Sequence, residues 1–143
     1  MNKVFIKKFE LNIPFEEDIL IYGIVSTEIP YRLVWYINKH YPFAFERVDD
    51  YTIIKDTIET SFAKYTFIHE ENHTTYTLLA NKKERINLIP ELKTYDYLLL
   101  VSGAIDYLDE PALKAIFQQI PIVQIVYNIN SDTIKTNLSY LIA

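Results

Sequence analysis

The sequence has no cysteine and only two glycines among its 143 residues. Without cysteine there can be no disulfide framework, no thiolate nucleophile and no cysteine-ligated zinc. Gly23 and Gly103 are isolated, which excludes the glycine-rich loops that hold phosphates in P-loop and dinucleotide-binding proteins. A serine nucleophile on a strained strand–turn–helix elbow needs glycines around it, and Ser102 followed by Gly103 lacks that pattern.

Positive charge is also scarce. The 14 Lys and Arg residues against 19 Asp and Glu give a formal net charge of −5, which argues against nucleic acid as a partner. The longest uncharged run, residues 115–131, carries glutamines, asparagines and a proline that a membrane helix would not accept. The first eight residues lack the apolar core of a signal peptide. We therefore expect a cytoplasmic protein that does not enter a membrane.

Hydrophobic patterning predicts the α+β class: a single globular domain over residues 1–143, with two to three helices and a mostly antiparallel sheet of about five to seven strands. The strands are expected at 4–11, 19–25, 43–48, 61–69, 74–80, 96–102 and 122–129, with a turn or bend at 49–50 and residues 51–60 ambiguous between strand and helical turn. The helices are expected at 31–40, after an Asp109 cap, and after Asn130 or Ser131, on one face of the sheet. Residues 97–129 could form one parallel crossover.

The segment from His69 to His73 reads His-Glu-Glu-Asn-His and matches the zinc-protease pattern H-E-x-x-H. That chemistry requires a helix, because residues four apart then share one face and can bind one metal ion. Here the flanking residues are typical of strands, so the segment is interpreted as the tip of a hairpin with a four-residue loop. Carboxylates are plentiful elsewhere, but nothing in the sequence places a pair at catalytic separation. No catalytic residue, metal ligand or cofactor is predicted.

Four motifs together resemble a known family. They are Tyr31-Arg32-Leu33-Val34-Trp35 with Asn38, Arg47-Val48-Asp49-Asp50, Thr75-Tyr76 with Leu79-Ala80-Asn81, and the run Leu88-Ile89-Pro90-Glu91-Leu92-Lys93-Thr94-Tyr95-Asp96-Tyr97-Leu98-Leu99. Over roughly residues 20–103 this combination is similar to the IPExxVDY family of small bacterial proteins. One departure is Tyr95, where the family pattern has valine. The resemblance implies a cytoplasmic domain and supplies no activity.

The polar and aromatic residues of these motifs form the candidate site. Its members are Tyr31, Arg32, Trp35, Asn38, Arg47, Asp49, Asp50, Asn81, Glu91, Asp96 and Tyr97. In the favoured interpretation the arginines bind the carboxylates and fasten loops to the first helix, and Trp35 belongs to the core. In the alternative, the same side chains line a polar recess walled by Trp35 and Tyr97.

The two interpretations lead to two functions. The first is a non-catalytic interaction or accessory module that binds a protein partner or a second copy of itself through a tyrosine-rich surface. The second is a small-molecule-binding protein or small enzyme built on the arginine, aspartate and glutamate side chains. A deep recess would support the second function, and side chains scattered over the surface would argue against it.

Overall fold

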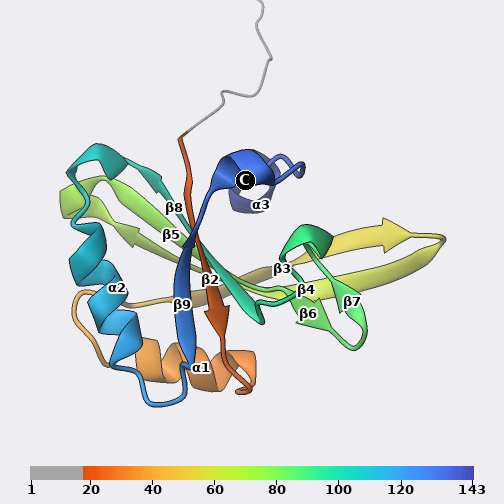
Figure 1. Cartoon of the computed structure of the whole chain (residues 1–143), viewed down its shortest axis with the longest axis horizontal. Coiled ribbons are helices and arrows are strands. Elements are labelled where there is room, and N and C mark those ends of the chain that lie inside the picture. Colours follow the sequence, from red (N-terminus) through yellow and green to blue (C-terminus); the bar gives the residue numbers. More distant parts are fainter. Residues whose placement is uncertain (1–17) are drawn as a thin grey trace, which may run out of the picture.

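The computed structural model describes residues 18–143, so the strand expected at 4–11 lies outside the described residues. The described chain forms a six-stranded sheet in the order β3-β4-β5-β8-β2-β9, with every neighbouring pair antiparallel (Figure 1), and a separate ribbon of β6 and β7. The strands are β2 (Leu20–Val25), β3 (Glu46–Lys55), β4 (Ile58–His69), β5 (Thr74–Ala80), β6 (Lys82–Lys83), β7 (Ile86–Asn87), β8 (Tyr97–Gly103) and β9 (Ile125–Ile129). The α-helices are α1 (Pro30–Ile37), α2 (Glu110–Gln118) and α3 (Ser139–Ile142), and the 3₁₀ helices are η1 (Glu70–Asn72), η2 (Pro90–Leu92), η3 (Ile105–Tyr107) and η4 (Ser131–Thr133).

This arrangement confirms the α+β class and the mostly antiparallel sheet. The apolar run expected as a central strand is β8, which lies between β5 and β2. Because β2 is antiparallel to both β8 and β9, those two strands are parallel to each other, and α2 lies in the connection between them. The parallel crossover over residues 97–129 is therefore confirmed, although one strand separates its two ends.

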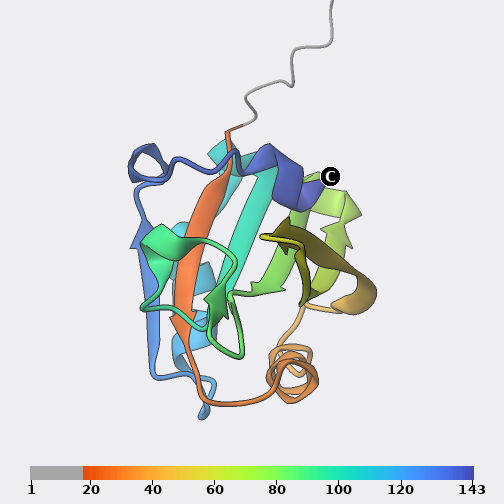
Figure 2. The ribbon, with the colours of Figure 1, turned by 90° about the vertical axis from the view of Figure 1, so that its right-hand side faces the viewer.

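Each face of the sheet is covered by its own hydrophobic layer. On one face, α1 and α2 pack through residues such as Leu33, Ile37 and Phe117 against Tyr22 and Leu99 of the sheet. On the other face, the loop around η2 and the chain around α3 pack over the remaining apolar side chains (Figure 2). The core residues of this second face include Ile21, Phe62, Leu79, Ile89, Leu98, Leu100, Leu138 and Leu141. Both faces of β8 are thus buried, which explains its nearly unbroken apolar sequence.

Three local expectations were wrong. Asp49 and Asp50 do not end a strand; they lie within β3, where the pairing with β4 shifts register between Val48 and Tyr51, because a β-bulge bends a strand without ending it. The expected last helix is divided into η4 and α3, separated by a loop. The helices do not all lie on one face, because Leu138 and Leu141 pack with the second layer rather than with α1 and α2.

A proline marks the first turn of both α1 and α2, but only α2 has a side-chain cap, because the N-cap residue of α1 is Ile29. The side chain of Asp109 accepts a hydrogen bond from the backbone N–H of Ala112 at 3.1 Å, and Pro111 occupies the first turn of α2, as expected. Pro30 begins α1, which ends at Ile37 and is followed by the polar residues Asn38 to His40. The two helices that cover the first layer are therefore set by local sequence signals.

Candidate functional site

The two histidines of the zinc-protease pattern lie on a hairpin, as the flanking residues predict. His69 is the last residue of β4, η1 forms the loop, and His73 has a left-handed backbone with φ of 54° before β5 begins. His69 stacks on Phe67, with ring centroids 5.6 Å apart. Among residues 18–143, no group of three or more histidine, aspartate or glutamate side chains is arranged to hold a metal ion. The helical geometry that gives this pattern its chemistry is thus missing.

Asp96 stands at the start of β8 and holds two other elements. One carboxylate oxygen accepts the backbone N–H of Ser26 at 2.9 Å, and the other lies 3.2 Å from Nζ of Lys82. The neighbouring Tyr97 is buried, and its hydroxyl donates to the backbone carbonyl of Glu28 just before α1. Asp96 and Tyr97 therefore fasten the loop between β2 and α1 to the centre of the sheet.

A recess of about 250 Å³ lies at this point, between the N-terminal end of α1 and the ends of β5 and β8. It is lined by Ser26, Thr27, Glu28, Ile29, Pro30, Ala80, Lys82, Asp96 and Tyr97. Burial, together with the nearby charge of Asp96 and the groups of Tyr65 and Glu28, raises the pKa of Tyr97 well above its ordinary value. A phenol held neutral in this way donates a hydrogen bond; it does not act as a base at neutral pH.

The side chain of Asn81 holds a loop in place through hydrogen bonds to backbone groups. Its side chain is fully buried, and its amide nitrogen donates to the backbone carbonyls of Leu92 and Tyr95, each at 2.9 Å. Its amide oxygen accepts the backbone N–H of Ile89, also at 2.9 Å. One asparagine thus satisfies three backbone groups of the loop that carries η2 and closes that loop over the second hydrophobic layer.

Glu91 also binds backbone rather than a ligand. One of its carboxylate oxygens accepts the backbone N–H of Lys135 at 2.9 Å, which joins η2 to the chain after η4. This hydrogen bond is the main reason why the pKa of Glu91 lies below its ordinary value. Glu91 is therefore ionised at neutral pH and serves as an acceptor on the opposite face of the sheet from Arg32 and Trp35.

The remaining motif residues pair locally. Arg47 forms an ion pair with Asp50 at 2.7 Å on the exposed edge of the sheet, and its guanidinium lies 5.4 Å from the ring centroid of Tyr65. Asn38, at the end of α1, donates from its amide to the carbonyl of Phe45 and accepts the N–H of Phe45. Asp49 is exposed within β3.

The outer face of α1 presents the largest aromatic side chains of the candidate site. Tyr31 and Trp35 lie one turn apart, and they are 67% and 55% exposed. The expectation that Trp35 belongs to the core was wrong, because Leu33, Val34 and Ile37 are the residues of α1 that face the sheet. The ammonium of Lys39 lies 3.7 Å from the centroid of the Trp35 ring, within the range of a cation–π interaction. Arg32 forms an ion pair with Glu28 at 3.3 Å.

The candidate residues therefore do not converge on one cavity. Asp96 and Tyr97 meet at the recess beside α1, whereas Asn81 and Glu91 fasten the loop around η2, and Arg47 pairs at the sheet edge. The favoured expectation was that the arginines bind the motif carboxylates and fasten loops to the first helix. Arg47 does bind Asp50, but both residues lie on β3, so this pair fastens no loop to α1. The expectation does not hold for Arg32, whose partner is Glu28.

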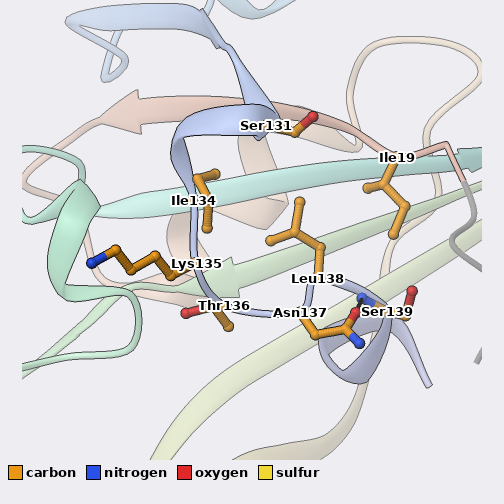
Figure 3. A pocket seen from close by; sticks show the side chains of 8 residues that line it. All are labelled: Ile19, Ser131, Ile134, Lys135, Thr136, Asn137, Leu138 and Ser139. Carbon is orange, nitrogen blue, oxygen red and sulfur yellow. Dashed lines mark hydrogen bonds between the residues drawn. The ribbon is translucent and has the colours of Figure 1, made fainter.

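A larger pocket, of about 340 Å³, was not expected from the sequence. It lies beside the start of β2 and is lined by Ile19, Ser131, Ile134, Lys135, Thr136, Asn137, Leu138 and Ser139 (Figure 3). The side chain of Lys135 extends away from the other lining side chains. Asn137 accepts the backbone N–H of Ser139 at 3.0 Å, and none of the lining residues is a carboxylate or a histidine. The pocket therefore lacks the imidazole and carboxylate groups that most often serve in acid–base catalysis. The polar run at 130–139 is the only sequence signal that points to it.

Comparisons of the chain with protein-family models, with curated proteins and with solved structures found no match. The resemblance to the IPExxVDY family thus stays a prediction. Within residues 18–143, no helix reaches the length and apolarity that crossing a membrane demands; the longest, α2, has nine residues.

Proposed function

We propose that this protein is a non-catalytic, cytoplasmic interaction module that binds a protein partner through the outer face of α1. The observation that carries the proposal is the exposure of Trp35 and Tyr31 on one side of a helix whose other side is packed in the core. Tryptophan and tyrosine dominate the binding energy of protein interfaces because they bury a large area with few rotatable bonds.

The charge of this face indicates the chemistry of the partner. Residues 30–40 contain Arg32 and Lys39 but no aspartate or glutamate, although the whole chain carries a net charge of −5. Arg32 is already paired with Glu28, whereas the ammonium of Lys39 lies over the exposed Trp35 ring. A partner with an apolar side chain for the aromatic rings and a carboxylate for Lys39 would match both features. We therefore infer an acidic segment with an apolar anchor.

The small-molecule alternative has less support. The recess at the start of α1 is small, and its polar groups already bind one another: Asp96 binds Ser26 and Lys82, and Tyr97 binds the carbonyl of Glu28. A ligand would have to replace these hydrogen bonds. At the outer face of α1, a partner would exchange only the exposed contact between Lys39 and the Trp35 ring.

The test places a photoreactive phenylalanine analogue at position 35 of the full chain and, in a matched control, at position 107. Tyr107 is almost fully exposed on η3, at the other end of the sheet from α1 (Figure 1). We expect the probe at position 35, irradiated in extract of the source cell, to cross-link repeatedly to one protein that the probe at position 107 does not reach. The purified pair then gives an affinity, which Trp35→Ala should weaken by about 30-fold, the effect of losing a hot-spot residue.

Tyr107→Ala serves as the matched control and should leave that affinity unchanged. The proposal fails if the probes at both positions give the same cross-links or give none. It also fails if the purified partner binds the Trp35→Ala variant as tightly as the parent chain. Circular dichroism of the variant separates loss of binding from loss of folding. We expect an unchanged spectrum, because Trp35 is exposed and contacts Tyr36 and Lys39 at the surface.

A further inference from the structure

The strand β9 lies at one edge of the sheet. Within the described residues it pairs only with β2, and its other side has no strand beside it (Figure 2). An edge strand presents unpaired backbone N–H and C=O groups, which can pair with a further strand. The opposite edge of the sheet is formed by β3.

The two edges differ in their protection against pairing. β3 carries the charged residues Glu46, Arg47, Asp49, Asp50 and Lys55, and a β-bulge interrupts its ladder, which are the usual devices that keep an edge strand from pairing with another chain. By contrast, residues 124–130, which contain β9, include no charged residue and no proline. The edge formed by β9 is thus the one suited to strand pairing.

Aromatic side chains beside β9 enlarge this surface. Ile125 and Tyr127 are 50% and 56% exposed. The ring of Tyr127 stacks on that of Tyr95, with centroids 6.5 Å apart and planes inclined by 12°. The Tyr95 ring lies in turn against Gly23 of β2, where an added Cβ would come within 2.4 Å of it. The edge therefore adjoins a pair of stacked aromatic rings, those of Tyr95 and Tyr127.

We propose that the free edge of β9 pairs antiparallel with β9 of a second copy of this chain, about a two-fold axis at Tyr127. Antiparallel pairing about such an axis places each Tyr127 opposite its counterpart and joins the two sheets into one. Two chains that each carry a net charge of −5 repel each other, and an uncharged edge lets them meet without opposing like charges. This surface is separate from the outer face of α1, so the proposal goes beyond the proposed function.

Sedimentation of the full chain tests the proposal first. We expect a species of twice 16.9 kDa at about 100 µM, and Ile125→Lys should shift it to the monomer by adding a charge to each edge. Ile54→Lys is the matched control because Ile54 is an exposed isoleucine on the opposite edge strand, β3. This variant should leave the dimer intact.

Disulfide trapping gives a second, independent readout, since the chain has no cysteine of its own. Directly paired antiparallel residues bring their Cα atoms to about 4.5–5.5 Å, which a disulfide can span. Under mild oxidation we expect Tyr127→Cys to form a linked dimer about tenfold faster than Ile54→Cys. A chain that remains monomeric at this concentration, with equal linkage rates for the two variants, overturns the proposal. A monomer in which the β9 amides directed away from β2 are nevertheless protected from hydrogen exchange also overturns it, and shows that another segment of the same chain covers the edge.

Discussion

Replacing Asn81 by alanine tests whether one buried side chain holds the loop between β5 and β8 closed. The variant removes the three hydrogen bonds of the amide and leaves the carbonyls of Leu92 and Tyr95 and the N–H of Ile89 without their partner. Each buried group left without its partner costs about 1–3 kcal/mol, so the free energy of unfolding should fall by at least about 3 kcal/mol. For a chain of this size, that loss corresponds to a fall in Tm of at least about 9 °C.

Urea denaturation followed by circular dichroism measures the free energy of unfolding, and hydrogen exchange at the Ile89 amide reports on the loop itself. Asn72→Ala serves as the control because Asn72 is exposed in η1 at the hairpin tip, and we expect a change below about 0.5 kcal/mol there. A loss below about 1 kcal/mol for Asn81→Ala, with unchanged protection of Ile89, would refute the reasoning. The loop would then be held by its apolar residues alone.

Two further predictions concern the same region. Gly23→Ala should destabilise the chain by about 2 kcal/mol, because the added Cβ would overlap the Tyr95 ring, and this cost should largely disappear in a Tyr95→Val background. Denaturation of the single and double variants measures the coupling energy between the two positions. Losses of stability that simply add would contradict the packing argument. Glu91→Gln should remove a stabilisation of less than about 1 kcal/mol at pH 6, small because the carboxylate is exposed. Since the pKa of Glu91 is lower in the folded state, this stabilisation is present above the unfolded pKa and is lost as the pH falls through the folded pKa. Parent and variant should therefore converge in acid denaturation measurements, once the pH is below the folded pKa. A difference that stays constant with pH would contradict the hydrogen bond from Lys135.

Much of the architecture could be predicted because local signals and tertiary packing agree. The cap at Asp109, the proline at position 111 and the apolar spacing after them mark α2 without knowledge of its neighbours. The uninterrupted apolar run of β8 likewise predicts a central position, because both faces of that strand are buried. In α2 and β8, the residues that favour the helix or strand locally are also the residues that pack in the core.

Other parts depended on contacts that a single sequence does not reveal. The register shift in β3 near Asp49 and Asp50 is set by the pairing with β4, so two adjacent acidic residues resemble a turn when read alone. Trp35 has helical spacing with Tyr31 and Asn38, but which side of α1 faces the sheet is decided by Leu33 and Ile37. The division of the last helix reflects packing of Leu138 and Leu141 on the second face.

The candidate site shows the same division. Opposite charges among the motif residues could be expected to pair, but closeness in sequence does not explain the pairing of Arg47 with Asp50. A regular strand places residues three apart on opposite faces, and here the register shift between Val48 and Tyr51 breaks that alternation. The partners of Asn81 and Glu91 could not be expected either, since they are backbone groups brought close by the fold. Residues 69–73 show the reverse: the letters match a metal-binding pattern, but the strands on either side give them another geometry.

The position of β2 has a consequence for how the chain acquires its structure. This strand ends at Val25, yet both of its neighbours in the described sheet lie far along the chain: β8 begins at Tyr97 and β9 at Ile125. Within the described residues, the pairings of this almost wholly apolar strand are therefore all long-range, and such pairings form slowly because a long loop must close first. A fragment that stops before β8 would therefore leave β2 without its neighbours in the described sheet and exposed to aggregation.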